Sequence, residues 1–221
     1  MNWRALRHPV YRALWMASVA SNLGTWLQSV GASWLMTSLA ASATMVAMVQ
    51  AVTSLPMFLL SLPAGALADV LDRRRLLLVT QSWMLACAVA LGLLTAAGLV
   101  TPGLLLLFTF LLGLGTALNG PAWQSIVPEL VPREELPGAV TLQSIGFNIA
   151  RAIGPAIGGL LVAAAGPEAT FFLNAASFVG VLWVLVRWRR TPMESVLPAS
   201  GSSAPCGPAC ATSVTPRTCA R

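Results

Sequence analysis

The sequence predicts an all-α membrane protein with six transmembrane helices and a disordered C-terminal tail. Only 9% of the 221 residues are charged, whereas a soluble domain carries about a quarter. Six apolar segments are each long enough to cross ~30 Å of hydrocarbon as a helix. They lie at residues 13–37, 43–68, 76–100, 103–127, 139–165 and 169–188. We therefore expect a six-helix transmembrane domain over residues 13–190.

The distribution of arginine predicts how these helices are oriented. All 13 basic residues are arginine, and Arg151 alone lies deep within a predicted span. The others fall in segments that alternate with the remaining loops, namely 1–12, 69–75, 128–138 and the residues after 186. Because cytoplasmic loops are enriched in Lys and Arg, we expect a multi-pass protein of a bacterial-type plasma (inner) membrane with a cytoplasmic N-terminal segment, 1–12. Trp3, Tyr11 and Trp15 are expected as headgroup anchors around this segment.

The most charged stretch, GALADVLDRRRL at residues 65–76, joins the second and third predicted helices. Such a stretch cannot lie in hydrocarbon, so we expect a tight loop at the cytoplasmic surface. It resembles the signature between the second and third helices of the major facilitator superfamily, G-x-L-A-D-R-x-G-R-R-x-L. The matching positions assigned to a conformational-switch motif are Gly65, Asp69, Arg73 and Arg74. A generic positively charged loop is the alternative interpretation.

One position departs from this signature. Asp72 stands where the family usually has glycine. Glycine adopts a left-handed backbone conformation readily, and aspartate does so less readily. The departure puts in doubt whether the turn before the third helix uses that conformation.

A second resemblance covers residues 119–161. This run is similar to the superfamily branch that contains enterobactin-type siderophore exporters and their multidrug relatives. Within it, a glycine-proline element like that of the antiporters defines a helix-bend motif at Gly154, Pro155, Gly158 and Gly159. Small residues four apart let two helices approach closely, and proline bends a helix. The glycines are open to two interpretations, helix packing alone or packing together with a rocking motion.

The first predicted span is unusually polar. Asn22, Ser29 and Ser33 recur at helical spacing, and Gln28 lies nearby. Unsatisfied polar groups in lipid cost several kcal/mol each, so this face is expected to contact other helices or water. These polar residues have two equally open interpretations, which are packing between helices and lining of a substrate cavity. Asn22 and Gln28 are candidates for such a cavity.

Arg151 is the strongest single candidate for a functional residue. It lies about 18 Å along the fifth span, near the middle of the membrane, where a charged side chain is costly and usually functional. None of the spans carries a deep Asp or Glu that could pair with it. Asn148 lies one turn away on the same face and could support it. A role facing the cavity and a structural role at helix ends are both open.

The composition changes after Arg190. Residues 191–221 contain no aromatic side chain and many Pro, Ser, Thr and Ala residues. We interpret them as a disordered, non-native tail that is frameshifted or truncated. Cys206, Cys210 and Cys219 lack the spacing of a zinc site, and no cofactor or metal is expected.

The resemblance implies one half of a major facilitator fold, built as a 3+3 inverted repeat. The implied function is export of a small molecule such as a siderophore or drug by alternating access, with proton antiport in the full-length form. An anionic substrate fits Arg151 best. The expected partners are the lipid bilayer, the small-molecule substrate, protons and a missing C-terminal half or a second copy.

Other classes of function are disfavoured. The alternative to a transporter is a truncated, non-transporting membrane fragment, inactive or assembled with a second half. An enzyme is not expected, because no cluster in the spans has catalytic spacing. Nucleic acid is not an expected partner, because the arginines flank apolar runs and form no aromatic-interleaved patch.

The orientation can be tested by labelling. A Ser42→Cys variant should react with an impermeant maleimide from outside the cell, and a Leu71→Cys variant should not. The reason is that Ser42 lies in a predicted external loop and Leu71 in the arginine-rich cytoplasmic loop. Labelling in the reverse sense would contradict the six-helix topology.

Overall fold

The computed structural model describes residues 3–40, 42–70 and 72–188, with the side chains of residues 3 and 61–70 left out. The side chain of Asp69 therefore lies outside the described part of the chain, and for Gly65 only the helical backbone is described. The predicted tail, 191–221, lies outside it as well.

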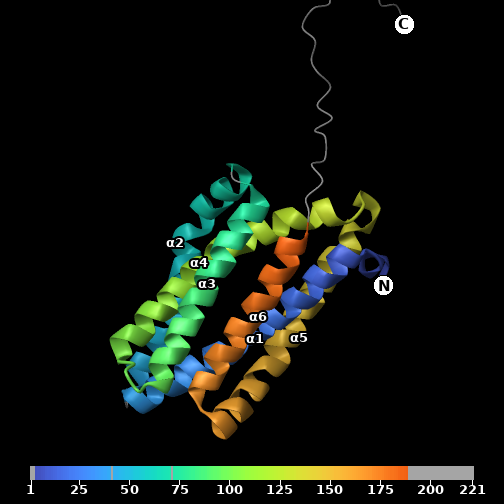
Figure 1. The fold of residues 1–221 in the computed structure, drawn as a ribbon. Coiled ribbons are helices and arrows are strands. Elements are labelled where there is room, and N and C mark those ends of the chain that lie inside the picture. The colour runs from blue at the N-terminus through green and yellow to red at the C-terminus, as the bar shows by residue number, and fades with distance from the viewer. Residues whose placement is uncertain (1–2, 41, 71, 189–221) are drawn as a thin grey trace, which may run out of the picture. The chain divides into compact units, whose positions relative to one another are not determined.

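Six long helices make up the described chain (Figure 1). They are α1 (Pro9–Leu39), α2 (Ala43–Val70), α3 (Arg73–Ala96), α4 (Pro102–Leu130), α5 (Leu136–Ala165) and α6 (Pro167–Arg187). Two short 3-10 segments, η1 (Trp3–Arg7) and η2 (Arg133–Glu135), precede α1 and α5. No strand occurs within these residues. The prediction of helices in six segments is thus confirmed to within several residues at each end.

Five of these helices, α2 to α6, are long and apolar enough to cross a membrane. The first helix, α1, has 31 residues and is long enough, but it is not among the five in the described chain. Its polar residues lower its mean hydropathy. A helix of this kind has to be covered by its neighbours, because lipid offers no hydrogen-bond partner.

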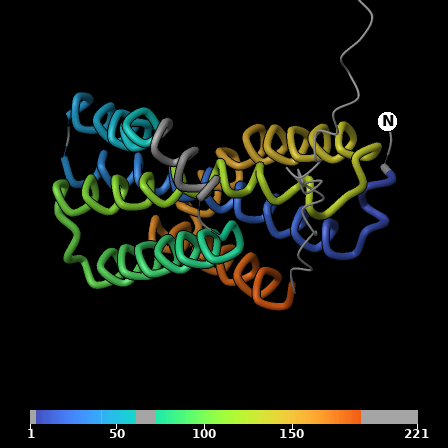
Figure 2. Tube along the Cα trace, turned by 90° about the horizontal axis from the view of Figure 1, so that it is seen from above, coloured from blue at the N-terminus to red at the C-terminus, as the bar shows by residue number. Residues whose placement is uncertain are grey.

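The arrangement of the helices gives α1 such cover. Figure 2 shows α2 and α5 along one side and α3 and α6 along the other, with α1 and α4 between them. The principal packing pairs are α1 with α5 and α6, α4 with α2 and α3, and α3 with α6. Each of α1 and α4 therefore contacts a helix on either side.

Close approach of α1 to α5 and α6 depends on glycine. A methyl group at Gly154 of α5 would lie 2.6 Å from Cβ of Trp26, and one at Gly158 would lie 3.1 Å from Cβ of Val30. On the other side of α1, a methyl group at Gly24 would lie 2.6 Å from Oδ1 of Asn174. Small residues at these positions let the helix backbones touch, which is how membrane helices gain packing energy.

The α2–α3 connection corrects the expected loop. α2 continues to Val70 and α3 begins at Arg73, so most of the 65–76 stretch is helical. Asp72 is the N-cap of α3, and its Oδ1 accepts a hydrogen bond of 2.9 Å from the Arg75 N–H. Its φ is −61°, so the turn does not use a left-handed conformation at this position. Aspartate suits the position because its carboxylate satisfies a free helix N–H.

The α3–α4 connection is a helix stop followed by a helix start. Gly98 has φ 68°, and Leu99 N–H donates to the Leu94 carbonyl, which closes a Schellman turn. Thr101 then caps α4 by accepting a hydrogen bond from Leu104 N–H at 3.3 Å. Proline at the first position of α4 lacks the N–H that would otherwise be unsatisfied. This turn ends α3 at Ala96, earlier than the predicted residue 100.

Two of the expected headgroup anchors, Tyr11 and Trp15, form hydrogen bonds to α5, and the side chain of the third, Trp3, lies outside the described part of the chain. Tyr11 is 1% exposed, and its hydroxyl donates to the Ala139 carbonyl at 2.9 Å. Trp15 Nε1–H donates to the Leu142 carbonyl, also at 2.9 Å. Both residues therefore join the start of α1 to the start of α5, because these carbonyls lie within reach across the helix interface. The prediction of a headgroup anchor was wrong for the buried Tyr11, whereas for the half-buried Trp15 it stays a prediction.

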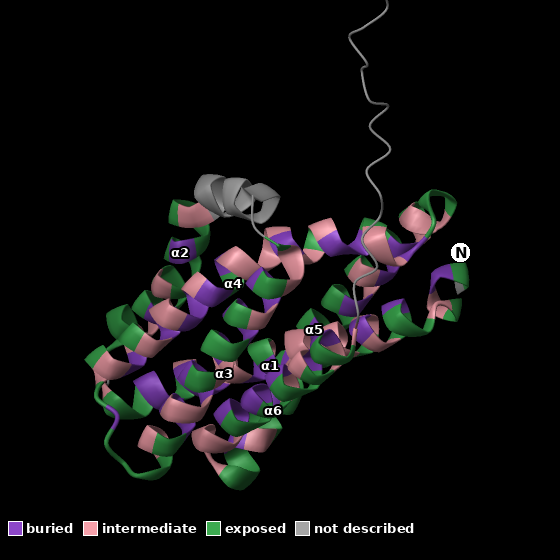
Figure 3. Ribbon diagram, turned by 45° about the horizontal axis from the view of Figure 1, so that its top comes forward, coloured by how far each residue is buried: buried purple, intermediate pink, exposed green. Residues whose placement is uncertain are grey.

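The outward faces of the helices are apolar. Buried residues lie where helices face one another, and exposed residues lie outward (Figure 3). Large exposed side chains include Phe58, Leu160 and Trp183, at 82%, 73% and 58%. Exposed apolar side chains in this number suit a surface that faces lipid.

The glycine packing can be tested with a matched pair. Gly154→Ala should destabilise the protein by about 1–3 kcal/mol, because the added methyl collides with Trp26. Gly159→Ala should be neutral or stabilising by up to about 1 kcal/mol, because nothing lies within 4 Å of its new methyl. Thermal unfolding of the purified protein in detergent measures both. Equal effects of the two substitutions would contradict the packing assignment.

Candidate functional site

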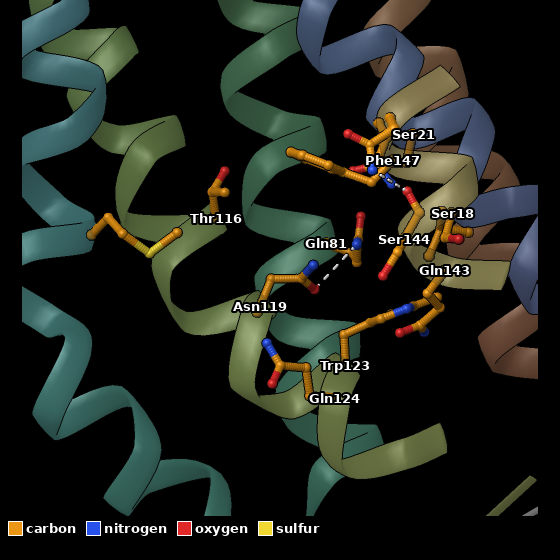
Figure 4. Close-up of a pocket in the computed structure, with 15 residues that line it drawn as sticks. Ser18, Ser21, Gln81, Thr116, Asn119, Trp123, Gln124, Gln143, Ser144 and Phe147 are labelled. Carbon is orange, nitrogen blue, oxygen red and sulfur yellow. Dashed lines mark hydrogen bonds between the residues drawn. The ribbon is translucent and has the colours of Figure 1, made fainter. Parts of the chain in front are cut away.

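A cavity of about 420 Å³ opens inside the bundle. All six helices contribute to its wall, and we call it the six-helix cavity (Figure 4). Its lining residues are Ser18, Ser21, Asn22, Met57, Gln81, Thr116, Asn119, Gly120, Trp123, Gln124, Gln143, Ser144, Phe147, Asn148 and Val181. Most of these side chains carry hydroxyl or amide groups, and none is charged.

A buried hydrogen-bond network forms one wall of the six-helix cavity. Gln81 of α3 is 2% exposed, and its Nε2 donates to Asn119 Oδ1 of α4 at 3.2 Å. Thr80 Oγ1 lies 3.5 Å from the same Asn119 oxygen. A buried acceptor without a partner costs about 1–3 kcal/mol, and Gln81 Oε1 is such an acceptor among the described residues. This atom is therefore a buried, unsatisfied acceptor in the wall.

A second cavity of about 410 Å³ lies along the other half of α1, and we call it the α1 pocket. It is lined mainly by α1, with one residue from α2 and one from α5. The lining residues are Trp26, Ser29, Val30, Ser33, Trp34, Thr37, Gln50 and Pro155. Along both α1 and α5 these residues follow those of the six-helix cavity, so the two cavities succeed one another along the helix axes.

The predicted polar face of α1 is divided between the two cavities. Asn22 lines the six-helix cavity, and Ser29 and Ser33 line the α1 pocket. Gln28 lines neither, because at 100° per residue its side chain is turned about 120° from Asn22. Its Oε1 instead accepts a hydrogen bond from Asn174 Nδ2 of α6. The structure therefore places Gln28 in the α1–α6 interface.

Arg151 lies on the face of α5 that connects the two cavities. It is one turn from Asn148, which lines the six-helix cavity, and one turn from Pro155, which lines the α1 pocket. Its side chain is exposed and makes no hydrogen bond or ion pair with the described residues. Asn148 Nδ2 donates to the Ser144 carbonyl at 2.8 Å, so this N–H is engaged within α5.

Arg73 and Arg74, which the loop signature singled out, bind the ends of two other helices. Arg73 Nη1 donates to Glu129 Oε1 at 2.9 Å and to the Ser125 carbonyl at 3.0 Å, both on α4. Arg74 donates from Nε to the Leu185 carbonyl and from Nη2 to the Val186 carbonyl, each at 3.0 Å, in the last turn of α6. These arginines join the start of α3 to the ends of α4 and α6.

The glycine-proline element is not a single unit in space. Gly154 and Gly158 are buried against α1, whereas a methyl group added at Gly159 would have no neighbouring atom within 4 Å. Pro155 lines the α1 pocket, and α5 continues through it as one helix. Two glycines of the element thus pack helices, and its proline borders a cavity.

Several cavity residues carry a weak signal in the sequence. Gln143, Ser144 and Gln124 are isolated polar residues near helix ends, where loops are also polar. Trp123 and Phe147 look like ordinary apolar span residues. Gln81 had a clearer signal, because an amide in the middle of an apolar segment needs a partner. What it faces could not be read from spacing alone.

An apolar helical bundle with open cavities lined in part by polar side chains is typical of membrane transport proteins. Residues 1–204 match the family of transmembrane secretion effectors, MFS_3, and the chain belongs to this family within the major facilitator superfamily. The family inferred from the loop signature is thereby confirmed.

Three relatives illustrate the similarity. The chain is 33% identical over 165 residues to the staphyloferrin A transporter of Staphylococcus aureus, which covers 74% of this chain and 42% of the relative. It is 29% identical over 178 residues to the multidrug efflux pump Tap of Mycobacterium tuberculosis, or 78% and 42% of the two chains. It is 28% identical over 189 residues to the enterobactin exporter EntS of Salmonella typhimurium, or 84% and 45%. The aligned part therefore spans less than half the length of these relatives.

The contacts at the start of α3 can be tested with neighbouring arginines. Arg74→Ala should lower the free energy of unfolding by about 1 kcal/mol, because it removes two charged hydrogen bonds to a helix end at a partly exposed site. Arg75→Ala is the control. The Arg75 side chain is exposed, and its substitution removes the same charge as Arg74→Ala does. Thermal unfolding in detergent should therefore separate the two variants. An equal loss of stability would mean that only the charge of the segment matters.

Proposed function

We propose that this chain forms a six-helix half of a bacterial membrane exporter that moves a small molecule by alternating access. The observation that carries the proposal is a polar cavity to which all six helices of the bundle contribute. The relatives named as a siderophore transporter, an efflux pump and an exporter support it. A siderophore or a drug is the proposed class of substrate, with proton antiport in the full-length form.

The packing pattern supports a 3+3 inverted repeat. Exchanging α1 with α4, α2 with α5 and α3 with α6 turns the α1–α5 contact into the α4–α2 contact. The same exchange turns α1–α6 into α4–α3 and leaves α3–α6 unchanged. Every principal contact therefore has a counterpart, as expected of two three-helix units in opposite orientations. On this basis six spans are proposed, with α1 as the polar one and the N-terminus in the cytoplasm.

Arg151 is proposed to bind an anionic part of the substrate. It is an exposed cation between two polar cavities, and it has no acidic partner among the described residues. An intramembrane charge of this kind is costly unless water or a ligand solvates it. Asn22 and Asn148 are proposed to line the same path, because both border the six-helix cavity.

The α2–α3 segment is proposed as the conformational switch. Arg73 and Arg74 hold the ends of α4 and α6, so a change in their contacts would move these helices relative to α3. Gly65 and Asp69 are proposed to belong to the same switch on the strength of the family signature.

Transport by the purified chain tests the proposal. Liposomes that contain the protein and carry an imposed pH gradient should release trapped carboxyfluorescein, an anion, faster than protein-free liposomes do. The same liposomes should release ethidium, a cation, more slowly than they release carboxyfluorescein. Arg151→Gln should reduce anion release about tenfold or more, because it removes a charged hydrogen bond to the substrate. Arg75→Gln is the matched control, because Arg75 is exposed at the start of α3.

Two results would count against the proposal. Release no faster than in protein-free liposomes would favour the alternative, a non-transporting membrane fragment that is inactive or needs a second half. Equal release by wild type and Arg151→Gln would remove Arg151 from the substrate path.

A further inference from the structure

The last turn of α6 presents a cation on the outer surface of the bundle. The Arg187 guanidinium lies over the Trp183 ring, with 4.4 Å between Cζ and the ring centroid. Both side chains are exposed, and Arg187 forms no hydrogen bond or ion pair with the described residues. The ring face holds the guanidinium by a cation–π interaction. The N–H groups at the edge of the guanidinium therefore stay available to a ligand.

Arg74 of α3 places a second positive charge at the same helix end. It donates to the Leu185 and Val186 carbonyls, each at 3.0 Å, and Arg187 is the next residue along α6. Carbonyls in the last turn carry the negative partial charge of a helix C-terminus. Because Arg74 binds two of these carbonyls, the guanidinium of Arg187 is left to an outside partner.

The acidic residues around this helix end are placed elsewhere or engaged. Glu168 is the only acidic residue of α6, and it lies in the first turn, at the opposite end of the helix. Asp72 caps α3 by accepting a hydrogen bond from the Arg75 N–H, and Glu129 of α4 pairs with Arg73. The end of α6 therefore carries positive charge and no carboxylate of its own.

Apolar side chains adjoin this charged end. α3 and α6 form one side of the bundle (Figure 2) and pack together through a shared core cluster. Outside that cluster, Val79 of α3 and Val179 and Val186 of α6 are exposed. A cation at the end of a helix and apolar side chains on the turns before it match the two parts of a phospholipid, the headgroup and the acyl chains.

We propose that Arg187 and Trp183 form a binding surface for the phosphate of an anionic phospholipid. The guanidinium donates to the phosphate oxygens, and the acyl chains lie along the exposed valines of α3 and α6. An anionic headgroup fits better than a zwitterionic one, because the amine of the latter would bring a further positive charge to Arg74 and Arg187. With the N-terminus in the cytoplasm, as proposed above, this lipid belongs to the cytoplasmic leaflet.

Native mass spectrometry of the purified full chain in detergent tests this surface. The protein is mixed with equal amounts of phosphatidylglycerol and phosphatidylcholine that have the same acyl chains, and the ratio of the two lipid adducts is measured. Wild type should prefer phosphatidylglycerol. Arg187→Gln should lower this preference about fivefold, because one basic side chain near a membrane surface attracts anionic lipid to about this extent.

Further variants make the result specific. Arg133→Gln is the matched control, because Arg133 is also exposed but lies in η2, next to two glutamates. It should change the preference by less than about twofold. Trp183→Leu should lower the preference about twofold or more, since the guanidinium loses the ring that holds it, whereas Trp183→Phe should retain most of it. This second pair keeps the test valid if Arg187→Gln does not fold.

Certain outcomes would overturn the inference. Equal preference in wild type and Arg187→Gln, or an equal loss in Arg133→Gln, would mean that the lipid responds only to the overall charge. Displacement of phosphatidylglycerol by glycerol phosphate, which has the phosphate but no acyl chains, would mean a general anion site. The inference goes beyond the proposed function, because a chain that releases no dye from liposomes would lose the exporter assignment and keep the lipid surface.

Discussion

The requirement that polar groups in a membrane be satisfied within the protein governs this structure. A polar side chain on a span gains nothing from lipid, so it must meet another helix or a water-filled space. Gln28 meets Asn174 of α6, and Gln81 meets Asn119 of α4. The first pair joins helices that are distant in the sequence, and the second joins the consecutive helices α3 and α4. The polar groups left over line the two cavities, which is why the most polar helix, α1, lies between other helices.

Electrostatics at the helix ends follows the same logic. Three consecutive arginines in the first turn of α3 oppose the positive end of its helix dipole. The structure compensates in two ways. Arg73 pairs with Glu129, and Arg74 binds carbonyls at the negative end of α6. Asp72 supplies the negative charge that the start of α3 favours. A segment whose charge suits the cytoplasmic side thereby also fastens three helices together.

The two cavities divide the chemistry that a substrate would meet. The six-helix cavity offers neutral hydrogen-bonding groups and aromatic surface, whereas Arg151 offers a positive charge at its border. Because α1 and α5 run past both cavities and pack through Gly154 and Gly158, a movement between these two helices would alter both at once.

The helices were predictable because their determinants are local. A long apolar segment is by itself enough to predict a helix in lipid. Five of the six predicted segments coincide with helices that are apolar enough to span, and the remaining one, 13–37, coincides with α1. The charged stretch after residue 65 was recognisable for the same reason. The length of the loop in this stretch was not predictable from the sequence. Asp72 caps α3, so the loop is shorter than expected.

The sequence by itself determined where the helices lie and to which family the chain belongs, because both follow from residues that are neighbours in the chain. Only the tertiary structure decided what each polar side chain faces. Asn22 and Gln28 are six residues apart on one helix, yet the first lines a cavity and the second binds α6. The orientation of α1 about its own axis decides which of the two faces the cavity, and this orientation is set by the packing of α1 against α5 and α6. The structure likewise decided that the nitrogen of the Gln81 amide bonds to Asn119 while its buried oxygen has no hydrogen bond among the described residues.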